Sequence, residues 1–85
     1  MGNVDIEAAL EKITVFLQKW YPPEIAPLVV KKQLQATGAM ADNLTEKDID
    51  LLLSRIQMVI LPSFMPPDKA RREVMRLKKE IGIGF

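Results

Sequence analysis

Cysteine and histidine are both absent from this 85-residue sequence. Without cysteine the chain can form neither a disulfide framework nor a zinc–thiolate site, and such a composition is typical of the reducing cytoplasm. Without histidine it lacks the commonest general base and the commonest transition-metal ligand, so its hydroxyl side chains have no imidazole to activate them. We therefore predict a cytoplasmic protein that is not an enzyme.

Long hydrophobic runs are missing as well. The longest apolar stretches are residues 25–30, which Pro27 interrupts, and residues 58–61. A membrane-spanning helix needs about 20 consecutive apolar residues. Residues 1–5 contain no basic segment and no apolar run follows them, so no signal peptide is predicted. These features predict a soluble protein without a transmembrane segment.

The sequence also lacks the motifs that bind phosphate groups or metal ions. Its glycines are not arranged as in a phosphate-cradling loop. A calcium loop starting at Asp42 needs glycine at its sixth position and glutamate at its twelfth, where Lys47 and Leu53 stand. A di-iron helical bundle needs Glu-x-x-His pairs. We predict no metal and no cofactor, and we assign the local carboxylates to favourable electrostatics at a helix start. They are Asp42, Glu46, Asp48 and Asp50.

Apolar residues at helical spacing are what the sequence does contain. They make up 48% of the chain, and its length leaves room for one core only, so residues 1–85 are expected to form a single domain. In the first predicted helix, residues 4–21, apolar side chains recur every three or four residues, as on one face of an α-helix. This stripe consists of Ile6, Leu10, Ile13, Leu17 and Trp20. Trp20 and Tyr21 are expected to cover the end of the core, before Pro22 stops the helix.

The second predicted helix, residues 24–38, has a less regular pattern. One face carries Ile25, Leu28, Val29 and Ala36, and the roughly opposite face carries Val30 and Leu34. We expect such a helix to pack against neighbours on two sides. Gly38 is placed to end it in the left-handed conformation.

The third predicted helix, residues 46–61, starts with a capping box formed by Thr45 and Asp48. Pro62 is expected to end it. Its core stripe is predicted to consist of Ile49, Leu52, Leu53, Ile56, Val59 and Ile60. Three further apolar residues lie off that stripe, namely Leu51, Met58 and Leu61. The helix is therefore apolar nearly all round and is predicted to be the most buried.

The fourth predicted helix covers residues 67–81, and Gly82 is placed to cap it. Its inward stripe is Ala70, Val74, Leu77 and Ile81. No window shows the strict alternation of a half-buried strand. Short loops between four helical segments favour sequential antiparallel neighbours, so the predicted fold is an all-α, up-down antiparallel four-helix bundle.

A basic face lies opposite the core stripe of the fourth helix. It consists of Lys69, Arg72, Arg76 and Lys79. From residue 63 onward the chain carries six basic and three acidic residues, whereas residues 1–62 carry six basic and eight acidic ones. This asymmetry suits contacts with phosphate groups or with an acidic protein partner. The alternative is a solvated face in which Lys69–Glu73 and Arg76–Glu80 form ordinary helical ion pairs.

A second candidate surface lies on the third helix. Leu51 and Met58 are seven residues apart and therefore align on one face, with Arg55 between them. One interpretation is that these three residues form a partner interface. The other is that Leu51 and Met58 pack against the second helix or against the connector at Phe64 and Met65.

Three functional hypotheses follow. The favoured one is a small non-enzymatic module or subunit that binds a protein, either itself or another, through helix faces; the outward Val15 and Met75 add to the apolar surface that motivates it. The alternative is nucleic-acid binding through the basic face of the last helix. The third and weakest is peripheral attachment to anionic membranes through the same helix and the apolar tail at residues 83–85.

Overall fold

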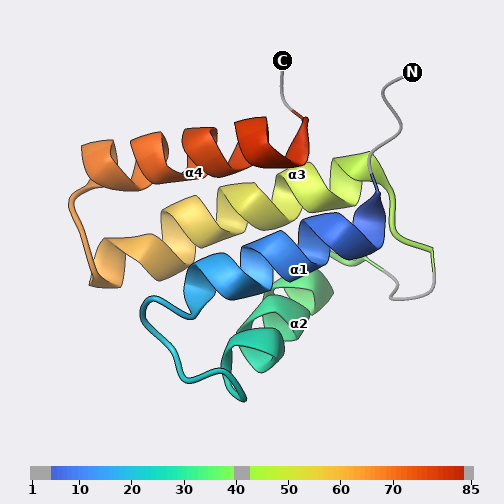
Figure 1. The fold of residues 1–85 in the computed structure, drawn as a ribbon, viewed down its shortest axis with the longest axis horizontal. Coiled ribbons are helices and arrows are strands. Elements are labelled where there is room, and N and C mark those ends of the chain that lie inside the picture. Colours follow the sequence, from blue (N-terminus) through green and yellow to red (C-terminus); the bar gives the residue numbers. More distant parts are fainter. Residues whose placement is uncertain (1–4, 40–42, 84–85) are drawn as a thin grey trace.

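Four helices enclose one core. The computed structural model describes residues 5–39 and 43–83, and within them the helices are α1 (Ile6–Leu17), α2 (Ala26–Ala36), α3 (Glu46–Arg55) and α4 (Pro67–Ile81), with no strand. Figure 1 shows α1, α3 and α4 side by side, with α1 and α3 running in the same direction, α4 running in the opposite direction and α2 inclined to the other three. Helix α3 contacts each of the other helices. The predicted all-α four-helix fold is confirmed.

Local hydrogen bonds set both ends of α1. At its start the Asp5 carboxylate accepts a hydrogen bond from the N–H of Ala8 at 3.2 Å, so Asp5 is the N-cap. Regular α-helical geometry ends at Leu17 rather than at residue 21. A tighter bond then runs from the N–H of Trp20 to the carbonyl of Leu17 at 3.0 Å. Such bonds satisfy the last carbonyl groups of a helix before the chain leaves it, here at the proline pair 22–23.

The ends of the next two helices follow the predicted capping motifs. Gly38 has a φ of 84° and follows α2, and the N–H of Ala39 reaches back to the carbonyl of Leu34 at 3.3 Å, as in a Schellman motif. At the start of α3 the N–H of Thr45 donates to Asp48 Oδ2 at 2.9 Å, while the N–H of Asp48 donates to Thr45 Oγ1 at 3.3 Å. The capping box and the role of Gly38 are both confirmed.

The helical stretch that begins with α3 changes its geometry after Arg55. Residues Ile56–Ile60 form a π-turn and residues Leu61–Ser63 form a 3-10 turn, so the stretch passes through Pro62 instead of ending before it. In a regular α-helix, the proline ring would collide with the carbonyl group four residues earlier. A wider π-turn moves that carbonyl away, which explains why the irregular turn immediately precedes the proline.

This π-turn reverses the expected positions of two side chains. The N–H of Leu61 bonds to the carbonyl of Ile56, five residues earlier, so Leu61 lies above Ile56 on the same face. Both side chains are fully buried, whereas Val59 is 48% exposed. The predictions that Val59 belongs to the core stripe and that Leu61 lies off it are therefore wrong. They assumed 3.6 residues per turn throughout, which does not hold here.

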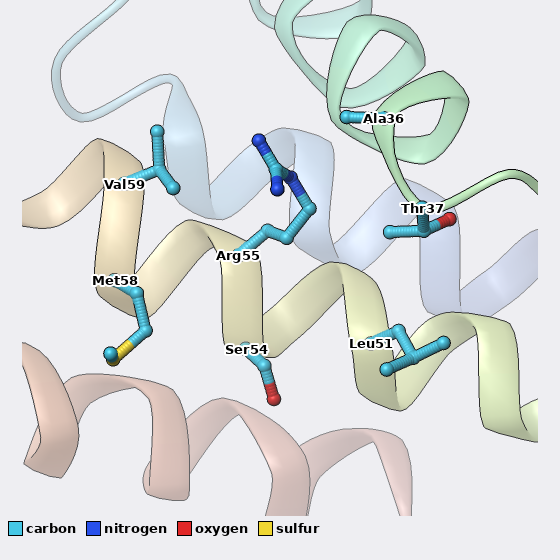
Figure 2. A pocket seen from close by; sticks show the side chains of 7 residues that line it. All are labelled: Ala36, Thr37, Leu51, Ser54, Arg55, Met58 and Val59. Carbon is cyan, nitrogen blue, oxygen red and sulfur yellow. The ribbon is translucent and has the colours of Figure 1, made fainter.

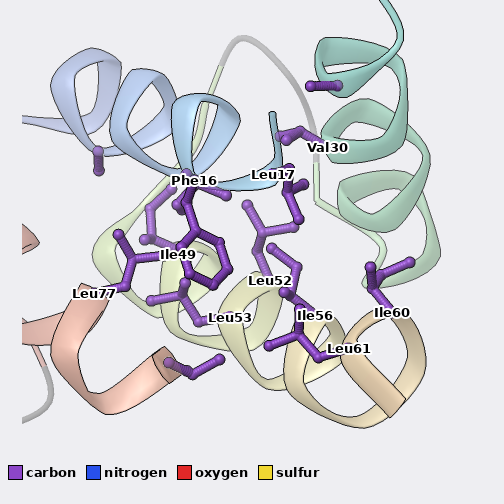
Figure 3. Packing of buried hydrophobic residues seen from close by; sticks show 14 of the residues in the cluster. Phe16, Leu17, Val30, Ile49, Leu52, Leu53, Ile56, Ile60, Leu61 and Leu77 are labelled. Carbon is purple, nitrogen blue, oxygen red and sulfur yellow. The ribbon is translucent and has the colours of Figure 1, made fainter. Parts of the chain in front are cut away.

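The core is formed by the inward faces of all four helices, and Figure 3 shows its packing around α3. Removing this apolar surface from water supplies the main driving force for folding. The largest side chains shielded completely or almost completely from solvent are Ile13, Leu17, Ile49, Leu52, Leu53, Ile56, Leu61, Val74 and Ile83. More than half of them come from α3 and the two turns that continue it, as expected for the helix predicted to be the most buried.

Helix α2 contacts two neighbouring helices, α1 and α3, as expected from its sequence. Ala26, Val30 and Gln33 face the core, because they recur at a spacing of four and three. Ile25 is 39% exposed and Leu28 is 59% exposed. Val29 and Leu34 are partly buried against the same core, whereas Ile25, which precedes the helix, and Leu28 point to solvent.

The chain folds back on itself after α4. Gly82 has a φ of 93°, a backbone conformation that residues with a Cβ rarely adopt. Its N–H donates to the carbonyl of Lys78 at 2.8 Å. This left-handed turn directs Ile83 into the core, where it is 2% exposed. Ile83 therefore contributes to the packing of the domain.

An aromatic cluster joins the α1–α2 connection to the α3–α4 connection. The ring of Trp20 stacks on Phe64 with centroids 5.6 Å apart, and Phe16 meets Trp20 edge-on at 5.2 Å. Tyr21 contacts Phe64 at 5.7 Å, also edge-on. Such geometries are the favoured ones for aromatic pairs. Trp20 and Tyr21 thus cover the end of the core, as predicted, and they do so together with Phe64.

Candidate interaction surface

A shallow groove opens on the outer side of α3, beside the C-terminal end of α2. Its volume is about 380 Å³. Figure 2 shows the side chains around it, which come from both helices and from the π-turn. They are Ala36, Thr37, Leu51, Ser54, Arg55, Met58 and Val59. The groove thus brings together the three residues predicted from the sequence as a partner interface.

Two of those three residues are large apolar side chains open to solvent. Leu51 is 41% exposed and Met58 is 72% exposed. With this much open surface, neither is a core residue, and the interpretation in which both are covered by α2 or by the α3–α4 connector does not hold. Whether a partner covers them stays a prediction.

The third residue, Arg55, is held in place by a buried partner. Its Nε donates to Gln33 Oε1 at 2.8 Å, and Gln33 itself is only 7% exposed. A buried amide oxygen needs a hydrogen-bond donor, so this contact satisfies Gln33 and fixes the guanidinium group between α3 and α2. Within residues 5–39 and 43–83, Arg55 forms no ion pair, and its remaining N–H groups make no hydrogen bond. Figure 2 shows the side chain reaching from α3 toward α2.

Val59 is the large apolar groove residue that sequence reasoning did not assign to this surface. The regular helical period assigns it to the core, but the π-turn rotates it outward beside Met58. Pro62 is the only local signal of this change, because a proline within a continuing helix requires the preceding turn to widen. The groove is consequently more apolar than the predicted pair Leu51 and Met58 would make it.

The basic face of α4 is exposed as predicted, and it is not neutralised by the expected neighbours. Within the described part of the chain, none of its four residues forms an ion pair. Glu73 instead lies 3.7 Å from Lys19 of α1, so the predicted Lys69–Glu73 pair is not formed. The Arg76–Glu80 pair is not formed either, and the carbonyl of Glu80 accepts from Lys12 Nζ at 2.8 Å. The free residues are Lys69, Arg72, Arg76 and Lys79.

The carboxylates of the acidic segment have structural partners. Asp48 takes part in the capping box, and Asp50 Oδ1 lies 3.0 Å from Lys78 Nζ on α4. That oxygen is shielded from solvent and accepts no well-aligned hydrogen bond, so the contact is an ion pair without hydrogen-bond geometry. Asp42 lies outside the described residues. Among residues 5–39 and 43–83, no three acidic side chains come close enough to hold a metal ion.

The tail proposed as a membrane contact is part of the core at its first residue. Ile83 is 2% exposed and cannot enter a lipid surface without leaving the domain interior. Residues 84–85 lie outside the described residues. In the segments 5–39 and 43–83, no helix has both the length and the apolar character that a bilayer crossing requires. The membrane hypothesis therefore loses part of the surface on which it rested.

Comparisons of this chain with protein-family models, with curated proteins and with solved structures found no match. Function is therefore inferred from the two surfaces described above. One is an apolar groove with a single charged residue among its described lining residues, and the other is a helix face whose four basic residues form no ion pair with residues 5–39 or 43–83.

Proposed function

We propose that the protein is a non-enzymatic interaction module that binds a protein partner through the groove on α3. The observation that carries this proposal is the solvent exposure of Leu51, Met58 and Val59 around one groove. A chain of 85 residues buries a small core and has few large apolar side chains to spare. Contiguous exposed apolar surface on such a domain is typical of a protein-binding site.

The composition of the groove supports the same function. Methionine is flexible and polarisable, and it packs adaptably against irregular partner surfaces. Methionine and arginine are both enriched in protein interfaces relative to other surfaces. The backbone beneath Met58 and Val59 is a π-turn, which occurs frequently at functional sites.

A purification experiment with matched variants tests the proposal. The tagged protein is purified from its own cells in the presence of nuclease, in parallel with Met58→Lys and with Arg76→Gln, a residue of the basic face that does not line the groove. We expect one partner protein to be recovered both with the wild type and with Arg76→Gln. When the affinity of this partner is measured with purified proteins, we expect it to bind Met58→Lys at least about tenfold more weakly than it binds the wild type. An ammonium group placed in an apolar contact must be desolvated, which accounts for this loss.

Met58 is largely exposed, so its lysine variant is expected to keep the circular-dichroism spectrum and melting temperature of wild type. Light scattering over a range of concentrations shows whether the partner is a second copy. If every protein bound by wild type binds equally well to Met58→Lys and to Leu51→Lys, the groove is not the binding site and the proposal fails.

The second candidate function is nucleic-acid binding through the basic face of α4, on which Arg72 and Arg76 lie centrally. One observation favours it: Glu73, one of the two carboxylates expected to neutralise that face, pairs with Lys19 instead. A row of cations without counter-charges on one helix is suited to a row of phosphate groups.

Salt dependence tests this second function. If the four basic side chains each neutralise a phosphate, the logarithm of the association constant for duplex DNA falls with the logarithm of salt concentration with a slope of roughly −3 to −4. The double variant Arg72→Gln/Arg76→Gln is expected to reduce that slope by about half. Fluorescence anisotropy with a labelled duplex gives both values. No binding at low salt, or an unchanged slope in the variant, excludes this function.

A further inference from the structure

We infer that the groove on α3 recognises an amphipathic helix of a different protein, and that this helix carries a carboxylate, bound by Arg55, between two apolar residues. This inference rests on the proposed function and adds the chemistry and spacing of the partner. Three observations lead to it: the charge of the groove, the spacing of its apolar side chains, and the symmetry that a second copy would impose.

The charge of the groove calls for an acidic ligand. Among the described residues that line it, Arg55 alone is charged. Gln33 holds its Nε at 2.8 Å and leaves the outer N–H groups of the guanidinium without partners in residues 5–39 and 43–83. A guanidinium held by one edge presents its other donors in a planar arrangement that fits a carboxylate. Gln33 thus acts as a positioning residue for Arg55.

The spacing of the apolar side chains fits a helix. Leu51 and Met58 are seven residues apart, which corresponds to about 10.5 Å along a helix axis. Arg55 lies between them, four residues after one and three before the other. A partner helix lying along α3 matches this arrangement with apolar residues seven positions apart and an acidic residue three or four positions after the first.

A second copy of this chain bound through the same groove does not supply that partner. Two copies related by a twofold axis present the same residues to each other. If the groove were centred on such an axis, Leu51 would meet Met58 of the other copy, and the two Arg55 side chains would face each other. Like charges brought together in a desolvated interface oppose association. The chemistry of the groove therefore points to a different chain that carries the missing carboxylate.

Two synthetic helical peptides test the inference. Both carry leucine at two positions seven residues apart, and they differ only in having glutamate or glutamine four residues after the first leucine. Binding to the isotope-labelled protein is followed by NMR, through the backbone signals of residues 51–59 and the Nε–H signal of Arg55. We expect the glutamate peptide to bind roughly 3- to 10-fold more tightly at low salt, with the preference declining as salt is added.

Three variants identify the source of that preference. Arg55→Gln removes the guanidinium group. Gln33→Glu keeps the size of the side chain but places a carboxylate next to Arg55, which neutralises the charge of the guanidinium. Each of these two variants is therefore expected to bind the two peptides with equal affinity. Arg76→Gln, on the basic face, is expected to retain the wild-type preference. If the wild-type protein binds both peptides equally, Arg55 does not select a carboxylate and the inference is wrong, although the proposed function stands. If neither peptide binds at millimolar concentration, the inference is also wrong, and the proposed function is decided separately by the Met58→Lys purification.

Discussion

Replacing Leu52 with alanine is expected to lower the free energy of unfolding by about 3 kcal/mol. Leu52 is completely buried at the centre of α3, so the substitution removes apolar contacts and leaves a cavity that neighbouring helices cannot fully close. Domains of this size have total stabilities of only about 5–15 kcal/mol, so the loss is a large fraction of the whole. Urea unfolding followed by circular dichroism measures it, as a lower midpoint at an unchanged slope.

The adjacent residue provides the matched control. Leu51 has the same side chain and belongs to the same helix, but it is 41% exposed. Leu51→Ala is expected to cost less than about 1 kcal/mol, because less apolar surface is lost and no closed cavity forms. Equal losses for the two variants would contradict the orientation of α3 on which both the core and the groove depend.

The second large effect concerns the π-turn. Leu61→Asn is expected to destabilise the protein by at least about 3 kcal/mol, because it removes a fully buried leucine and places an amide where it finds no partner. Val59→Asn is expected to cost less than about 1 kcal/mol, because Val59 is 48% exposed. Thermal unfolding of the two variants, followed by circular dichroism, gives their relative stabilities.

A regular α-helix through residue 61 would produce the opposite order. In that geometry Val59 continues the core stripe of Ile49, Leu52 and Ile56, and Leu61 turns away from it. A greater loss of stability in Val59→Asn than in Leu61→Asn would therefore show that the π-turn is absent. The two substitutions thus report on backbone geometry through a simple comparison of stabilities.

The sequence predicted buried faces and helix ends correctly where a single physical requirement determined which residues could stand there. In α4 the inward stripe at Ala70, Val74 and Leu77 is fully or almost fully buried, because a single apolar face on a charged helix has only one way to avoid water. Gly38 was assignable for a similar reason, since few residues other than glycine adopt a positive φ readily. These local rules were enough to predict four helices, the capping box that begins α3 and the glycines that end α2 and α4.

Helix α2 could not be oriented from its own residues. Its apolar side chains are distributed around the axis, so the helical period does not select one inward face. What selects it is tertiary structure: Gln33 is buried because Arg55, 22 residues later, supplies the donor for its amide oxygen. That pairing depends on how α2 packs against α3, so it cannot be predicted from the residues of α2 alone.

Part of the candidate site could be predicted from the sequence for the same reasons. Leu51 and Met58 were identified because they fall off the core stripe at a spacing of two helical turns. Their exposure, however, depended on where α2 lies, and the sequence favoured neither exposure nor burial. Val59 was missed because the period of the backbone changes within the same helical stretch. After an irregular turn, the helical period no longer predicts correctly which side chains face the core.

The stacked pair of Trp20 and Phe64 gives the molecule an intrinsic optical reporter. Trp20 is the only tryptophan in the chain, and its ring contacts a residue 44 positions away in the sequence. Its emission therefore responds to the docking of two distant connections, whereas circular dichroism responds to helix content alone. Coincidence of the two signals during unfolding distinguishes a single cooperative transition from early loosening at this end of the domain.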